Sequence, residues 1–154
     1  MMSTMKKLFS IILIIILLCF AGCSSSSTVK ENNTTFSNAV KAISVDEVAL
    51  SDLATFEWDT MYNFVHFTPK KNIEKVIGFS SKDIKETYNE GHTQLIFVKD
   101  KKVVCSIWGY SNNLGYFVSF GRYDGEYLAI QNNETALFTV DFSGKEILLT
   151  YVSE

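Results

Sequence analysis

The stretch "TQLIFVKDKKVVCSIW", residues 93–108, decides the fold of this chain. Two apolar runs, Thr93–Val98 and Val103–Trp108, are rich in β-branched and aromatic residues, and they flank four charged residues. Runs of this length and composition on either side of a polar turn predict two strands of a β-hairpin. We therefore expect a fold built on a β-sheet.

Two further turn signals follow this hairpin. Residues 116–122 and 126–130 flank "YDG", and an Asp-Gly pair favours a tight hairpin turn. Residues 135–142 and 146–152 flank "SGK" in the same way. Three successive hairpins predict an antiparallel meander.

Strand and helix signals precede the hairpins. Apolar residues alternate with polar ones over residues 55–67, which predicts a half-buried strand. Residues 68–78 predict a helix, with Thr68 and Pro69 at its start and Gly78 at its end. Residues 80–91 predict a second short helix. The expected fold is α+β, an antiparallel meander of about five to seven strands with one or two short helices packed on it.

The first 22 residues have the layout of a secretory signal. Lys6 and Lys7 precede an uncharged apolar run, Leu8–Phe20, and two small residues follow. The run is shorter than the roughly 20 residues that a stable membrane span needs. We expect this segment to direct export.

The residues Phe20, Ala21, Gly22 and Cys23 resemble the lipobox of bacterial lipoproteins, although that motif usually begins with an aliphatic residue. The resemblance covers only these first 23 residues. It implies that a diacylglyceryl group is attached to Cys23, that cleavage follows Gly22, and that the protein is held on the extracytoplasmic face of the cell membrane. The alternatives are an ordinary secretory signal or an uncleaved anchor with a chance cysteine.

This interpretation divides the chain into three parts. Residues 1–22 are the signal peptide, 23–45 the lipidated cysteine with a flexible polar tether, and 46–154 a single globular α+β domain. Serine-rich polar sequence buries too little apolar surface to order itself. Residues 38–46 are expected to be either a short helix or the end of the tether.

Charge and cysteine content exclude several classes of protein. Without Lys6 and Lys7, the mature chain has 12 basic and 17 acidic residues, a net charge of −5. Such a balance disfavours nucleic acid as a partner.

With Cys23 lipidated, Cys105 has no partner for an internal disulfide, and its apolar neighbours predict a buried, unreactive thiol. No cofactor or metal motif is present, and no metal site is predicted from His66 and His92.

Three aromatic residues are the candidate binding site. Trp108 and Tyr110 lie on the opposite strand parity to Cys105, and Tyr116 follows a polar loop. Exposed tryptophan and tyrosine are typical of binding surfaces; the alternative is that the helices cover these rings. We expect a binding or inhibitory module for an envelope protein or a wall polymer, and no enzyme.

The competing hypothesis is a cell-envelope hydrolase that uses Glu57, Asp59 and His66. Two carboxylates two residues apart on a strand lie about 7 Å from each other, a separation that suits acid-base catalysis. The alternative is that Glu57 and Asp59 are ordinary acidic residues on the solvent face of a strand, with no catalytic role. A third class is a lipoprotein that captures a substrate for an uptake system. The domain is too small for the two-lobed fold that such proteins usually have.

The lipid anchor predicts the behaviour of Cys23→Ala. Without the thiol, no lipid is attached, so the precursor stays unprocessed or is released and loses its normal membrane anchorage. Fractionation of the producing cell measures this. A mature, membrane-bound form of the variant would contradict the assignment.

Overall fold

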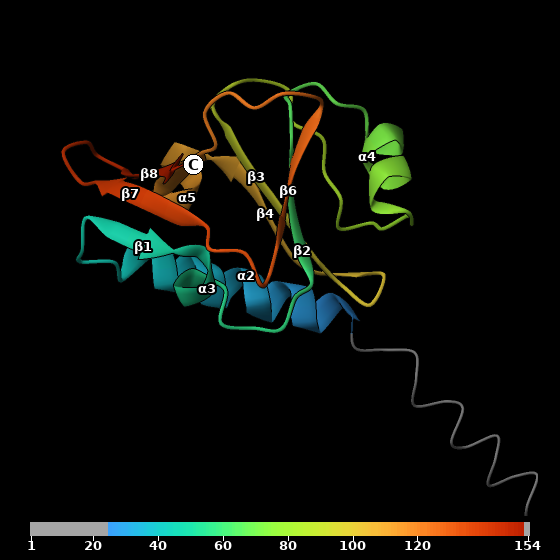
Figure 1. Ribbon diagram of the computed structural model, residues 1–154, viewed down its shortest axis with the longest axis horizontal. Coiled ribbons are helices and arrows are strands. Elements are labelled where there is room, and N and C mark those ends of the chain that lie inside the picture. Colours follow the sequence, from blue (N-terminus) through green and yellow to red (C-terminus); the bar gives the residue numbers. More distant parts are fainter. Residues whose placement is uncertain (1–24, 153–154) are drawn as a thin grey trace, which may run out of the picture.

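Eight strands form two four-stranded sheets in the part of the chain that the computed structural model describes, residues 25–152 (Figure 1). Sheet 1 has the order β1 (Glu47–Ala49), β7 (Leu137–Asp141), β8 (Ile147–Val152) and β5 (Tyr116–Ser119). Sheet 2 has the order β4 (Lys102–Tyr110), β3 (His92–Lys99), β2 (Thr60–Phe64) and β6 (Tyr127–Gln131). The helices are α2 (Ser25–Lys41), α3 (Leu50–Leu53), α4 (Lys70–Ile77) and α5 (Ser111–Leu114). Cys23 and the predicted signal peptide lie outside the described residues.

The predicted hairpin over residues 93–108 is confirmed as β3 and β4. Its turn residues, Asp100 and Lys101, have φ values of 48° and 57°, which is the pattern of a two-residue turn that matches the twist of the strands. Strand β3 is buried on both faces, with Phe97 on one side and Ile96 on the other. Sheet 2 therefore separates two hydrophobic clusters.

Both clusters draw side chains from several elements. The larger one joins sheet 2 to sheet 1, α2 and α3, and it includes Phe36, Leu53, Leu95, Phe97, Tyr116, Phe138 and Leu149. The smaller one lies between sheet 2 and α4, and it consists of Val29, Phe64, Ile73, Ile84, Ile96, Val98 and Val103. Helix α2 contributes to both.

The segment predicted to be a flexible tether is instead mostly helical. Helix α2 covers residues 25–41, and its few apolar side chains fall on one face. Val29, Phe36 and Val40 recur at helical spacing and are at most 5% exposed. The tether prediction is wrong because three well-placed apolar residues are enough to fix a polar helix on a domain that offers a matching surface.

Helix α2 also covers the outer edge of β4. The Asn32 Nδ2 donates a hydrogen bond to the Val104 carbonyl at 2.8 Å, and the Asn33 Oδ1 accepts one from the Ser106 N–H at 2.7 Å. These backbone groups face away from β3, and none of the strands that the structure describes lies beside them. The two asparagines thus close a sheet edge that would otherwise be open to pairing with another chain.

The α+β class and the mostly antiparallel pairing are confirmed, but the strands form two sheets instead of one meander. The predicted hairpin of β7 and β8 is present. The predicted hairpin of β5 and β6 is wrong, because β5 pairs in parallel with β8 and β6 pairs with β2. Residues 120–126 cross between the sheets, since both strands direct side chains into the larger cluster that the sheets share.

The helix predicted over residues 68–78 is confirmed as α4, Lys70–Ile77, with Gly78 as its C-cap at φ +89°. Its predicted start is wrong, because Pro69 is the N-cap and the Thr68 hydroxyl donates to the Val65 carbonyl. The predicted strand over residues 55–67 is shorter, because only 60–64 pair within sheet 2. Trp58 precedes the strand and packs its ring edge-on against Phe97, with ring centroids 5.4 Å apart.

The second predicted helix, residues 80–91, is wrong. This segment crosses the α4 side of sheet 2 without regular secondary structure. Its carbonyls accept hydrogen bonds from side chains of sheet 2 at 2.7–2.8 Å: Ser106 to Asp83, Gln94 to Lys85, and Trp108 to Glu86. Those bonds replace the ones that a helix would have made within itself.

The buried face of α2 predicts the effect of Phe36→Ala. Removing a ring that is 1% exposed should lower the free energy of unfolding by about 3–5 kcal/mol. The exposed Asn38 on the same helix gives a control, Asn38→Ala, which should change it by less than about 0.5 kcal/mol. Urea unfolding measures both. Equal stability of the two variants would mean that α2 does not belong to the core.

Candidate functional site

Exposed apolar side chains gather at one end of sheet 2. Strands β2 and β4 end there, and β3 and β6 begin there. Nine large apolar side chains are exposed in residues 25–152, and six of them lie at or next to this end: Val65, Phe67, Tyr88, Trp108, Tyr110 and Tyr127. We call these six residues the aromatic end. Exposed apolar side chains that gather in this way are a feature of many interaction surfaces, so this end is the candidate site.

Trp108 and Tyr110 lie at the aromatic end, beside His92. The two ring centroids are 4.9 and 3.9 Å from that of the imidazole. The Trp108 indole N–H donates to the Glu86 carbonyl at 2.7 Å, and the Asn89 side chain donates to the Tyr110 hydroxyl. The irregular segment before β3 thus covers part of each ring, and 38% of Trp108 and 41% of Tyr110 stay exposed.

His92 is a buried polar group beneath these rings. Its Nδ1 accepts a hydrogen bond from the Tyr88 N–H at 3.5 Å, so the ring proton is on Nε2 in the neutral form. The side chain is 4% exposed, and Nε2 has no hydrogen-bond partner among the described residues. A buried donor without an acceptor is uncommon in native proteins.

Tyr116 does not belong to this surface, and its predicted exposure is wrong. The ring is fully buried in the larger cluster, and its hydroxyl is 2.9 Å from the Ser37 Oγ on α2. Burial raises the pKa of Tyr116 to about 12. Helix α5 and Gly115, which has φ +83°, turn the chain out of sheet 2 before Tyr116 begins β5 in sheet 1.

The residues of the hydrolase hypothesis lie at opposite ends of β2. Glu57 Oε2 and Asp59 Oδ1 are 3.4 and 3.9 Å from the Lys99 Nζ, beside the β3–β4 turn. These two carboxylates, Glu57 first, raise the pKa of Lys99. His66 follows the other end of β2, seven residues from Asp59, which corresponds to roughly 20 Å along a strand. The structure does not bring the histidine and the carboxylates together.

His66 and Cys105 have different surroundings. The His66 Nδ1 is 3.3 Å from the Thr87 Oγ1, and burial lowers the pKa of this histidine, with Glu90 acting in the opposite direction. Cys105 is fully buried in the larger cluster, as its apolar neighbours predict, and burial raises the pKa of its thiol strongly. A thiol held protonated in this way is a poor nucleophile.

The described residues offer no assembled metal site, because no three histidine, cysteine, aspartate or glutamate side chains between 25 and 152 are placed to share an ion. Within the same range no helix has the length and apolar character that crossing a membrane requires.

Sequence reasoning missed Phe67 and Tyr88 as surface residues. Phe67 is 66% exposed and has a φ of 67°, which is uncommon for a residue with a bulky side chain. The position of Phe67 could have indicated its exposure, because it lies in a short connection between a predicted strand and a predicted helix. An aromatic side chain in such a connection is less often buried in the core than one within a strand or helix. Tyr88 lies within residues 80–91, for which the sequence predicts a helix that does not form.

No protein-family model, curated protein or solved structure matches the chain. The arrangement of its own residues is therefore the basis for the function proposed below.

The lowered pKa of His66 predicts how stability depends on pH. In the unfolded chain the imidazole takes up a proton near pH 6.5, whereas in the fold it does so only at lower pH. Below about pH 6.5 the unfolded state therefore binds more protons, and stability falls. Tm should decrease as the pH is lowered from 7.5 to 5.5, and His66→Gln should make that decrease smaller. Equal slopes for the two proteins would exclude His66 as the cause.

Proposed function

We propose that the protein is a lipid-anchored, extracytoplasmic binding module whose aromatic end contacts an envelope protein or a wall polymer. The single observation that carries this proposal is the gathering of six of the nine exposed large apolar side chains at one end of sheet 2. The lipid anchor on Cys23 rests on the sequence resemblance alone.

The chain enters the domain at the opposite end of sheet 2. In the first turns of α2, Val29 packs with Val98 and Val103, which flank the β3–β4 turn. From there β4 runs for nine residues to Tyr110 at the aromatic end. At roughly 3.3 Å per residue, the strand spans about 26 Å. With a lipid on Cys23, this geometry directs the aromatic end away from the membrane.

The helical form of residues 25–41 also affects how close the domain lies to the membrane. A lipid on Cys23 would be separated from the first residue of α2 by Ser24 alone. The domain would then sit close to the bilayer, with a fixed surface outward, instead of moving on a long tether. Such an arrangement suits a partner in the layer just outside the membrane.

The aromatic end has the chemistry of a contact surface. Its rings are large and have few rotatable bonds, so they add contact area at a small entropic cost. The hydroxyls of Tyr88 and Tyr110 can each make one more hydrogen bond at the rim of an apolar contact, because the first donates to Glu86 and the second accepts from Asn89. Aromatic faces of this kind bind the apolar loops of proteins and the flat faces of sugar rings.

Phe67→Ala tests the surface, because the ring is 66% exposed and contributes little to the core. We expect partner binding to weaken by about 2 kcal/mol or more, with Tm unchanged. Trp108→Ala should weaken it as well. The binding probes are isolated cell-wall sacculi and the detergent-solubilised envelope fraction of the producing cell.

The matched control is Phe142→Ala. Phe142 is 44% exposed but follows β7 in sheet 1, and it is not one of the six residues of the aromatic end. It should bind both probes as the wild type does. The proposal fails if Phe142→Ala and Phe67→Ala have the same effect, or if the wild type binds neither probe.

A further inference from the structure

The two outer strands of sheet 2 have different surroundings. The edge of β4 is covered by the Asn32 and Asn33 side chains of α2. Strand β6, at the other edge, has β2 on one side and, within residues 25–152, no strand on the other. An open edge is a template for a further strand.

The hydrogen-bond register identifies the outward groups of β6. The Val65 N–H donates to the Glu126 carbonyl at 3.1 Å, and the Asn132 N–H donates to the Asp59 carbonyl at 3.0 Å. In an antiparallel pair, alternate residues direct their N–H and C=O groups to the partner strand. Even-numbered residues of β6 therefore bond to β2, and the odd-numbered ones direct these groups outward.

Local bonds already occupy the last of the outward residues. Gln131 donates its N–H to the Glu134 Oε2 at 3.0 Å, and its carbonyl accepts from the Glu134 N–H at 3.0 Å. For Tyr127 and Ala129, the described residues supply no such bond. Two adjacent outward sites on β6, two residues apart, are thus free for a ladder with another strand.

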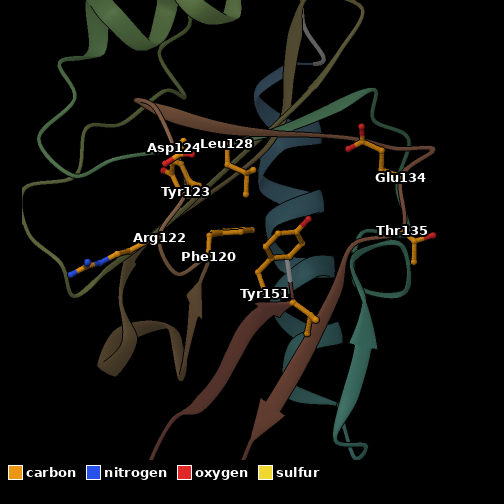
Figure 2. A pocket seen from close by; sticks show the side chains of 9 residues that line it. Phe120, Arg122, Tyr123, Asp124, Leu128, Glu134, Thr135 and Tyr151 are labelled. Atoms are coloured by element: carbon orange, nitrogen blue, oxygen red, sulfur yellow. The ribbon is translucent and has the colours of Figure 1, made fainter. Parts of the chain in front are cut away.

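A cleft of about 710 Å³ lies along β6 (Figure 2). Its floor contains Leu128 from β6, Tyr151 from β8 and Phe120, the residue that follows β5. The rings of Phe120 and Tyr151 have centroids 5.8 Å apart. An added strand that pairs with β6 would direct every second side chain toward this apolar floor.

The charged groups at the cleft indicate the character of its occupant. Asp124 and Glu134 line opposite ends of it in Figure 2, and Arg122, the only arginine of the sequence, directs its side chain away from the floor. The carboxylates favour a positively charged ligand.

We infer that β6 and this cleft bind an extended segment of a partner polypeptide, with apolar residues at alternate positions and lysine or arginine among the others. Backbone pairing would supply affinity, and the apolar floor would supply specificity, as in other proteins that bind a peptide by adding a strand to a sheet. The site shares Tyr127 with the aromatic end but includes neither Phe67 nor Trp108, and it does not depend on the role proposed for the aromatic end.

Ala129→Pro tests the pairing directly. Proline removes an N–H that faces outward, and edge strands tolerate proline at such a position, so the fold should persist. Ala129→Val is the matched control, because it keeps the N–H and favours the strand conformation. The probes are dodecapeptides selected from a random display library on the purified full-length protein.

We expect selected peptides to alternate in polarity and to lose about tenfold or more in affinity for Ala129→Pro, since the hydrogen-bond ladder is interrupted. Affinity for Ala129→Val should stay within about twofold. Undiminished binding to Ala129→Pro, or the absence of enriched peptides, would overturn the inference. Dimerisation that Ala129→Pro abolishes would assign the edge to a second copy of the chain and overturn it too.

A second measurement does not depend on the folding of the proline variant. Selected peptides are methylated at alternate backbone nitrogens in the two registers and are bound to the wild-type protein. Because a strand pairs through every second residue, one register should abolish binding and the other should retain it. Equal binding of both methylated forms would contradict strand addition.

Discussion

The docking of helix α2 along β4 is the contact on which the rest of the structure depends. The side chains of Asn32 and Asn33 satisfy the outer backbone groups of β4, while Val29 and Phe36 enter the clusters on the two faces of sheet 2. Removing the helix would expose a sheet edge and open both clusters at once. Because every later element packs on sheet 2 or on the larger cluster, the helix is part of the domain.

The same contact places the start of α2 and the aromatic end at opposite ends of sheet 2. The chain enters beside the β3–β4 turn, and the aromatic end lies at the far end of the strands. One edge of sheet 2 is closed by α2, and the other, β6, is open beside the cleft that Phe120 lines. A lipid on Cys23 would therefore hold the β3–β4 turn and the start of α2 near the membrane. Two surfaces would stay accessible: the aromatic end and the β6 edge.

Sequence patterns predicted some local elements correctly, but not the pairing of strands that are distant in the sequence. The β3–β4 hairpin and α4 were predictable because short-range periodicity and turn residues determine them. The parallel pairing of β5 with β8 was not, since no local signal distinguishes strands of two sheets that share one core.

Strand parity placed Trp108 correctly at the surface, whereas Tyr116 is buried because α5 turns the chain between the two residues. The helical form of residues 25–41 was hidden by polar composition: the asparagines that indicate a flexible segment in isolation are the groups that bind β4.

Amide hydrogen exchange at Ser106 tests the docking of α2 most directly. Its N–H is bonded to the Asn33 side chain and to no strand. If α2 is docked, the Ser106 N–H should exchange slowly in the wild-type protein, at a rate comparable with that of buried Leu95 in β3, and about tenfold or more faster in Asn33→Ala, with Leu95 much less affected. Fast exchange of Ser106 in the wild type, at the rate of an open edge, would show that α2 is not docked and leave residues 25–41 as the flexible tether that their composition suggests.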